Sequence, residues 1–135
     1  MASLYRSNKS YEEAEQLYEK AIEMRRHLFG VEHPDVARDF NNLALLYFYQ
    51  NRFSEAESLY QRALKIGQKV LREIHPDVGR ILDNLAMLYA AQNRHDEAEE
   101  LSERALNILR ETLGDTHPWT IRCLGNIEAL QETSD

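Results

Sequence analysis

Residues that break helices or cross-link a chain are scarce in this sequence. Its 135 residues include five Gly, three Pro and a single Cys, Cys123. So little Gly and Pro argues against a loop-rich β fold, whose turns depend on both residues. Because one cysteine cannot form an internal disulfide, we expect the protein to occupy a reducing, intracellular compartment.

Positive charge and long apolar runs are scarce as well. Sixteen Lys and Arg residues stand against 23 Asp and Glu residues, which gives a formal net charge of −7. This balance argues against nucleic acid and against a membrane surface as partners, because both attract basic faces. The longest apolar run, residues 43–49, is far shorter than the ~20 residues that cross a bilayer, and no signal peptide is apparent at the start. We therefore expect a soluble, cytoplasmic protein.

A period of 42 residues runs through the chain. The dipeptide His-Pro begins at His33, His75 and His117, and residues 33–74 match residues 75–116 at 22 of 42 positions without a gap. The same register extends back towards the N-terminus. Internal repeats of this length are typical of solenoid proteins, in which each repeat is one structural unit.

Each full repeat contains two helix patterns joined by a short connection. In the first full repeat, apolar residues follow the 3.6-residue period over about 34–50 and again over about 53–71. Pro34 suits the first turn of a helix, because an N–H at that position would have no helical partner. The connection, Asn51 and Arg52, is so short that the two helices must form an antiparallel hairpin.

The pattern of these residues resembles the tetratricopeptide repeat, which begins W-x2-L-G-x2-Y and carries alanines later in the unit. Phe40, Leu43, Ala44 and Tyr47 occupy the opening positions of the first full repeat. The usual period is 34 residues, so this repeat is eight residues longer. In its length, and in the Leu-Gly shortly before His117, it is similar to the repeats of kinesin light chains.

The resemblance implies an all-α fold: a right-handed α-solenoid of antiparallel helical hairpins, with about five long helices and an N-terminal partial helix. We expect one domain, residues 1–135, in which a partial repeat (1–32) precedes two full repeats (33–74 and 75–116) and a C-terminal capping helix (117–135). Glu128 departs from the pattern, since Ala stands at the matching positions of both full repeats. A carboxylate there predicts a helix face that is open to solvent.

Family members bind peptides in a concave groove lined by the first helices of their repeats, and the resemblance implies that role here. We expect a scaffold or adaptor protein with no enzymatic activity, no cofactor and no metal ion. Arginines and asparagines that recur every 42 residues would face the groove. Because arginine binds carboxylates and asparagine binds peptide backbone, we predict a peptide with an apolar or aromatic anchor flanked by acidic residues. The predicted groove residues are Arg38, Asn41, Asn42, Leu45, Phe48, Tyr49, Arg80, Asn84, Met87, Arg122 and Asn126.

Other interpretations of the same pattern stay open. The recurring Arg and Asn side chains would equally serve to pair with neighbouring helices, and Phe48 and Tyr49 would equally serve to pack the hairpins. At the level of function, the alternative is a structural module that self-assembles into a homo-oligomer. Its copies would stack end to end through exposed faces of the terminal hairpins.

Two residue types suggest chemistry that the pattern does not otherwise support. His33, His75 and His117 lie on successive loops, too far apart to share a metal ion, and their place before Pro predicts a role in helix entry. Cys123 lies near a helix start, which favours a lowered thiol pKa. Without a partnered histidine, however, we expect it to be inert.

Overall fold

The first helix of each repeat begins at the His-Pro dipeptide. In each case the histidine Nδ1 accepts a hydrogen bond of 3.1 Å from the backbone N–H two residues later, at Asp35, Asp77 and Trp119. The intervening proline has no N–H and needs no partner. The histidine thus caps the helix as a Ser or Asp side chain would, which confirms the predicted role of these histidines in helix entry.

The turns of the two full hairpins depend on an asparagine with a left-handed backbone. Asn51 has a φ of 61° and Asn93 a φ of 63°, and asparagine is one of the few residues other than glycine that adopt this conformation readily. After Asn51, the backbone N–H of Arg52 donates to the carbonyl of Tyr47 at 2.9 Å, and the second turn repeats this bond at 2.8 Å. The short connection therefore reverses the chain, as the sequence predicts.

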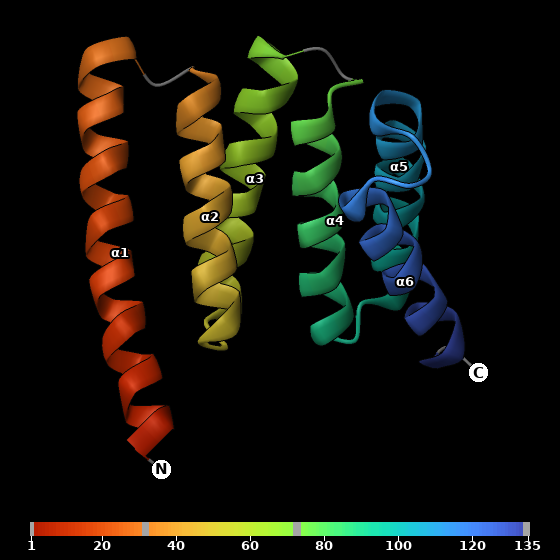
Figure 1. Ribbon diagram of the computed structural model, residues 1–135, viewed down its shortest axis with the longest axis horizontal. Coiled ribbons are helices and arrows are strands. Elements are labelled where there is room, and N and C mark those ends of the chain that lie inside the picture. The colour runs from red at the N-terminus through yellow and green to blue at the C-terminus, as the bar shows by residue number, and fades with distance from the viewer. Residues whose placement is uncertain (1, 31–32, 72–73, 134–135) are drawn as a thin grey trace. The chain divides into compact units, whose positions relative to one another are not determined.

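These signals produce six helices in the computed structural model, which describes residues 2–30, 33–71 and 74–133 (Figure 1). The helices are α1 (Ala2–Phe29), α2 (Pro34–Tyr49), α3 (Phe53–Val70), α4 (Pro76–Ala91), α5 (His95–Leu113) and α6 (Pro118–Thr133). Within these ranges no residue is in a strand and no helix is long and apolar enough to span a membrane. The chain divides within α3 into two compact units, unit 1 (Met1–Ile66) and unit 2 (Gly67–Asp135).

The predicted N-terminal partial helix does not end where the repeat would place a turn. Instead, α1 runs without interruption from Ala2 to Phe29. In the 42-residue register, Lys9 stands where Asn51 and Asn93 make the turns of the later repeats. Because lysine disfavours the left-handed backbone of such a turn, the helix continues through this position. The partial helix and the helix expected after it are therefore one element.

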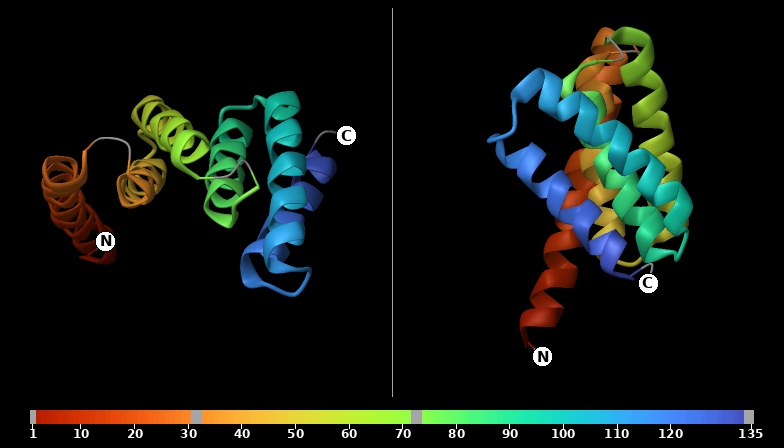
Figure 2. Two further views of the ribbon diagram at one scale, coloured as in Figure 1. Left: turned by 90° about the horizontal axis from the view of Figure 1, so that it is seen from above. Right: turned by 90° about the vertical axis from the view of Figure 1, so that its right-hand side faces the viewer.

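In unit 1, α2 lies between α1 and α3 (Figure 1, Figure 2). The guanidinium of Arg62, on α3, covers the ring of Phe40, with its Cζ 4.4 Å from the ring centroid. Between α1 and α2, Arg25 donates two hydrogen bonds to the carboxylate of Asp39, at 2.8 and 2.9 Å. Unit 1 thus joins its helices through aromatic and ionic contacts as well as apolar ones.

In unit 2, α5 packs against both α4 and α6. Leu82 of α4, Leu109 of α5 and Cys123 of α6 are all fully buried. Gly79 lets α4 approach α5 closely, because a Cβ at this position would lie 3.0 Å from Cδ2 of Leu109. The core of unit 2 therefore rests on close apolar contact between helices.

Candidate binding surfaces

On α4 and α6 of unit 2, several of the predicted groove residues contact one another. Arg122 donates a hydrogen bond of 2.9 Å from Nη2 to Oδ1 of Asn84 and also contacts the sulfur of Met87. Asn126 donates a hydrogen bond of 3.2 Å to Asp83, and the Nε of Arg122 lies 3.9 Å from the other carboxylate oxygen of Asp83. This part of the predicted surface is therefore an internal polar network, as the alternative interpretation of the repeated Arg and Asn allowed.

Asp83 is the centre of this network. Its side chain is buried, and burial raises the pKa of its carboxyl above the ordinary value, although the Asn126 amide and the Arg122 charge act in the opposite direction. Asn84 is only 1 % exposed, so that the protein itself covers the side chain that was predicted to bind peptide backbone. The network fixes the position of Arg122, whose side chain remains 38 % exposed.

Arg80 and Trp119 form a second feature of the same two helices. The guanidinium of Arg80 lies over the indole of Trp119, with its Cζ 4.7 Å from the ring centroid. The Nε of Arg80 is buried, and among the described residues it has no hydrogen-bond partner. An arginine stacked on an aromatic ring keeps its donors aligned for a carboxylate. Trp119 was missed by sequence reasoning, although it replaces the Asp that follows His-Pro in both full repeats.

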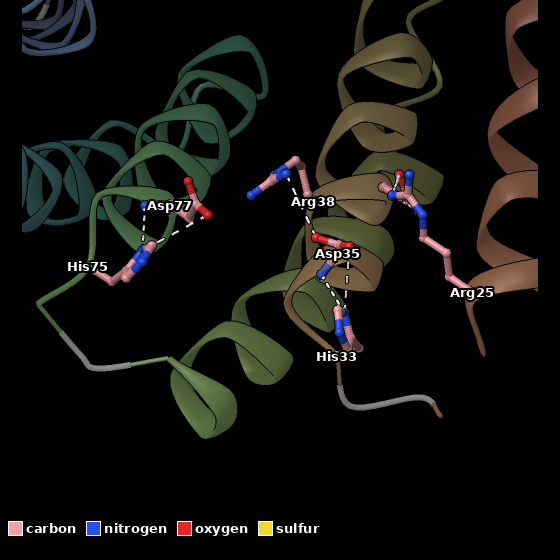
Figure 3. A network of polar contacts seen from close by, with 7 residues as sticks. Arg25, His33, Asp35, Arg38, His75 and Asp77 are labelled. Carbon is pink, nitrogen blue, oxygen red and sulfur yellow. Dashed lines mark hydrogen bonds and ion pairs between the residues drawn. The ribbon is translucent and has the colours of Figure 1, made fainter. Parts of the chain in front are cut away.

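The predicted groove positions of unit 1 lie on α2 and differ in exposure. Arg38 is exposed, with its Nη1 3.8 Å from Oδ1 of Asp35, one turn earlier on the same helix (Figure 3). Tyr49 is 55 % exposed, whereas Phe48 packs against Tyr49 and Phe53 with ring centroids 5.6 and 5.7 Å apart. Phe48 therefore helps to hold the hairpin together, while Arg38 and Tyr49 remain accessible.

The remaining predicted residues of α2 are less accessible. Asn41 is buried, at 3 % exposure, and Asn42 and Leu45 are partly buried. Burial of Asn41 favours a structural role for this amide, since a peptide cannot reach it without movement of its neighbours. Sequence periodicity alone does not separate a groove-facing position from a buried one when the two lie next to each other on a helix.

A cleft of 1290 Å³ opens on the other face of α2 in unit 1, between α1 and α3. Its apolar lining includes side chains from all three helices. Charged side chains of both signs surround this lining. Sequence reasoning did not identify it, because its walls come from segments that are far apart along the chain. The lining residues are Glu19, Lys20, Ile22, Glu23, Met24, Arg26, His27, Phe40, Leu43, Tyr47, Glu55, Ser58, Leu59 and Arg62.

Cys123 is a buried and unreactive cysteine, as predicted, and lacks the lowered thiol pKa that a place near a helix start favours. Its side chain is fully buried, and its thiol lies 3.5 Å from the backbone carbonyl of Ser102, to which it donates a weak hydrogen bond. Burial, reinforced by the nearby Asp83 carboxylate, raises the pKa of the Cys123 thiol to about 12. The thiol is therefore protonated near neutral pH and is a poor nucleophile. In the described part of the chain, no group of His, Cys, Asp and Glu side chains is placed to hold a metal ion.

Comparison with known sequences points to one family. A model of the tetratricopeptide repeat matches residues 1–69 and 77–135. No curated protein sequence matches the chain.

Solved structures agree in fold. The crystal structure of BtubC (BKLC) from P. vanneervenii has a TM-score of 0.84 and 26 % identity, covering 98 % of this chain and 52 % of that one. A putative kinesin light chain with nearly identical TPR-like repeats from Podosopora anserina has a TM-score of 0.81 and 27 % identity, with coverages of 98 % and 63 %. The N-terminal domain of stress-induced protein-1 from C. elegans, at 16 % identity, has a TM-score of 0.56 over 93 % of this chain and 97 % of that domain. These similarities confirm an all-α solenoid of helical hairpins, and the chain spans about half to two thirds of the first two proteins.

Proposed function

Because this chain belongs to the tetratricopeptide repeat family, whose repeats generally mediate protein–protein interaction, we propose that it is a non-catalytic scaffold or adaptor. Its ligand is a peptide with an apolar or aromatic anchor flanked by Asp or Glu. The primary contact surface lies on α4 and α6 of unit 2, around Arg80 and Trp119. The single observation that supports this proposal best is the stacked pair that these two residues form.

The chemistry of this pair suits an acidic peptide. Arg80 supplies a cation in a chain with a net charge of −7, and its buried Nε has no partner among the described residues. A carboxylate that approaches the guanidinium would gain hydrogen bonds aided by opposite charge. Trp119 provides an aromatic surface beside the same cation, against which an apolar anchor residue can pack.

In this proposal, Arg122 and Asn126 contribute to peptide binding mainly by maintaining the shape of the binding surface. Both contact the buried Asp83, so that a large part of the Arg122 charge is already balanced. The polar network holds α4 and α6 in register and places Met87 beside the Arg122 guanidinium. We propose that Arg80 discriminates for acidic ligands and that Arg122 and Asn126 keep the surface in its binding conformation.

The exposed groove positions of unit 1 extend the proposal. Within unit 1, Arg38 and Tyr49, both exposed on α2, offer a cation and an aromatic ring to a peptide. A reducing, cytoplasmic location also belongs to the proposal. It follows from the lone cysteine, which is typical of proteins in a reducing compartment.

Binding of a fluorescent peptide to the full chain tests the proposal. The probe is a short, fluorescent synthetic peptide with one Trp between Asp and Glu residues. Its binding is measured by fluorescence anisotropy. We expect a dissociation constant of about 1–10 µM and a loss of about ten-fold or more in affinity for Arg80→Glu. The control is Arg104→Glu, which reverses an exposed charge on α5. Equal affinity for wild type and Arg80→Glu would falsify the proposed contact.

Self-assembly is a second candidate function, supported by one feature of α6. Ile121 is 57 % exposed and Leu124 38 % exposed, one turn apart on the helix. In the 42-residue register their counterparts on α4, Gly79 and Leu82, are buried. Sedimentation velocity over a range of concentrations tests this candidate. Association of the wild type that is lost in Ile121→Glu supports self-assembly. A monomer at every concentration excludes self-assembly.

A further inference from the structure

The cleft of unit 1 is separate from the surface that the predicted groove residues of α2 form. Phe40, Leu43 and Tyr47 of α2 form its floor, and α1 and α3 form its two walls. On an α-helix these three positions point away from the predicted groove positions, such as Arg38 and Leu45, by about half a turn. The cleft is therefore independent of the proposed peptide surface.

The centre of the cleft is apolar and partly open. Ile22, Phe40 and Leu43 are buried beneath it, whereas Met24 on the α1 wall is 62 % exposed and Leu59 on the α3 wall is partly exposed. When another apolar surface covers exposed apolar side chains that border a hollow, the free energy of the system falls. The shape and the lining thus favour an occupant with an apolar face.

The charges along the cleft are polarised. At one end, Glu15 accepts a hydrogen bond of 2.8 Å from the Tyr47 hydroxyl, and Glu19 and Glu55 line the cleft beside it. Arg52 bonds to Glu15 and Glu55, and Lys20 lines the cleft next to Glu19, so that two positive charges stand against three carboxylates. This end is therefore anionic.

The opposite end is cationic. Arg62 lies over the Phe40 ring, and Arg26 lines the facing wall of α1 next to Arg25, which is paired with Asp39. These two arginines, Arg26 and Arg62, outnumber the one carboxylate here, Glu23, which lines the cleft one turn before Arg26. Glu19 and Arg26 are seven positions apart on the α1 wall, or about 10 Å along a helix axis. An occupant whose two ends carry opposite charges about two helical turns apart would match both ends.

The lining also bears on the backbone conformation of the occupant. The walls and floor are α-helices, whose N–H and C=O groups are bonded within each helix. The polar side chains of the lining are charged or hydroxylic apart from the imidazole of His27, and none is an amide that could clamp a peptide backbone. An extended peptide would leave its own backbone groups unpaired here, whereas a helix satisfies them internally.

We propose that the cleft between α1 and α3 binds one amphipathic α-helix of a partner protein. Its apolar face packs on Phe40, Leu43 and Met24. A cationic residue near one end of that helix pairs with Glu19 and Glu55. An anionic residue about two turns away pairs with Arg26 and Arg62.

Three designed peptides test the proposal on the full chain. Each is about 18 residues long, above the length at which isolated helices become stable enough to study. The first carries a Leu face with Lys at one end and Glu at the other. The second replaces the Glu residues by Lys, and the third replaces the Leu face by Gln. Labelled methionine methyl groups report the site, because Met24 lines the cleft and Met87 lies on α4.

We expect the first peptide to shift the Met24 methyl signal without moving that of Met87. The second should bind about five-fold more weakly, and the third should not bind. Arg62→Glu should invert the preference between the first two peptides, while Arg104→Glu, its counterpart 42 residues on, should leave it unchanged. If Arg62→Glu loses helicity in circular dichroism, Arg26→Glu at the same end of the cleft replaces it.

Each possible outcome of this experiment either supports or overturns the proposal. A Met24 shift with inverted charge preference in the variant supports the proposal. No Met24 shift with the first peptide, or equal binding of the first two peptides, overturns it. Because Arg80→Glu lies outside the cleft, that variant should bind the first peptide as wild type does, which keeps this test separate from that of the acidic-peptide surface.

Discussion

The interface between a second helix and the first helix that follows it uses different chemistry in the two units. In unit 1 this interface contains the ion pair of Arg25 and Asp39. In unit 2, the residues 42 positions further on are Gly67 and Ile81, which lie against each other. After another 42 residues the same positions are Leu109 and Cys123, which are both fully buried. The same two positions of the repeat are thus occupied by an ion pair, by a glycine against an isoleucine, or by two buried apolar residues.

The comparison extends to the alanines that let helices pack closely. On α5, Ala98 and Ala105 are fully buried, whereas their counterparts on α1, Ala14 and Ala21, are only partly buried. Among the described side chains, these two alanine positions are therefore less deeply buried on α1 than on α5. Unit 1 combines an ion pair and a cleft with alanines that are partly covered on α1 but fully buried at Ala56 and Ala63 on α3, while unit 2 combines a dense core with a fixed polar network. We infer that unit 2 contributes more to stability and that unit 1 is more open to a ligand.

The largest expected effect comes from the core of unit 2. Leu109→Ala should lower the free energy of unfolding by about 2–5 kcal/mol, because the removed side chain leaves a cavity among buried neighbours. Urea denaturation followed by circular dichroism measures the change. The matched control in unit 1 is Leu17→Ala, a leucine that is 68 % exposed on α1, for which we expect a change below about 0.5 kcal/mol. Similar losses for both variants would contradict the contrast between the units.

The ion pair of unit 1 gives the next effect. Arg25→Ala should reduce the free energy of unfolding by about 1–3 kcal/mol, because it leaves the buried carboxylate of Asp39 without its charged partner. Burial already raises the pKa of Asp39, and Arg25 opposes that shift. The same denaturation experiment measures the loss.

A double variant completes this test. Arg25→Leu combined with Asp39→Ile replaces the pair by apolar side chains, as in unit 2. Since buried ion pairs and well-packed apolar pairs are often of similar stability, we expect the double variant to unfold within about 1 kcal/mol of wild type. If the double variant loses more free energy of unfolding than Arg25→Ala alone, the stability of unit 1 requires the ion pair.

The polar network of unit 2 predicts a pH dependence. The pKa of Asp83 in the folded protein lies above its ordinary value of 3.8, so the folded state binds this proton more tightly than the unfolded state. Its contribution to the free energy of unfolding is therefore largest below pH 3.8 and declines as pH rises through the folded pKa. Asp83→Asn should remove this decline, so that the variant gains stability relative to wild type between pH 4 and pH 7.

A carboxylate with the opposite shift provides the control. Arg94 lowers the pKa of Glu97, so the stabilising effect of this group is present at neutral pH and is lost as pH falls through the folded pKa. Glu97→Gln should therefore lose stability relative to wild type as pH rises from 4 to 7. Identical pH profiles for the two variants would contradict the role of burial at Asp83.

The smallest expected effect separates two equivalent arginines. Arg62→Glu removes the contact with the Phe40 ring in unit 1, while Arg104→Glu changes an exposed position on α5 of unit 2. We expect the first variant to be less stable than the second by about 0.5–1 kcal/mol, the usual contribution of an exposed cation–π contact. Thermal unfolding of both proteins under one buffer condition gives the comparison.

Much of the fold could be predicted from local signals. The His-Pro dipeptides and the Asn-Arg turns act within a few residues, and the 42-residue period carries them along the chain. The continuation of α1 through Lys9 departs from the repeat pattern, because lysine disfavours the left-handed turn conformation that Asn51 and Asn93 adopt.

The sites were harder to predict, because they depend on contacts between distant segments. Asp39 meets Arg25 on another helix, and Asp83 occupies the position of Asn41 but meets Arg122 and Asn126. Periodicity places a residue on a helix face. It does not tell whether a neighbouring charge will satisfy that residue or whether a ligand must do so.

One spectrum addresses the central claim that acidic peptides bind unit 2 on α4 and α6. The full chain, labelled at its methionine methyl groups, is titrated with the Trp-containing acidic peptide while Met87 and Met24 are observed together. We predict that the Met87 signal moves in proportion to bound peptide, that Met24 stays in place, and that Arg80→Glu needs about ten-fold or more peptide to reach the same Met87 shift. Movement of Met24 alone, or a Met87 titration curve that is the same in Arg80→Glu as in wild type, would contradict the account.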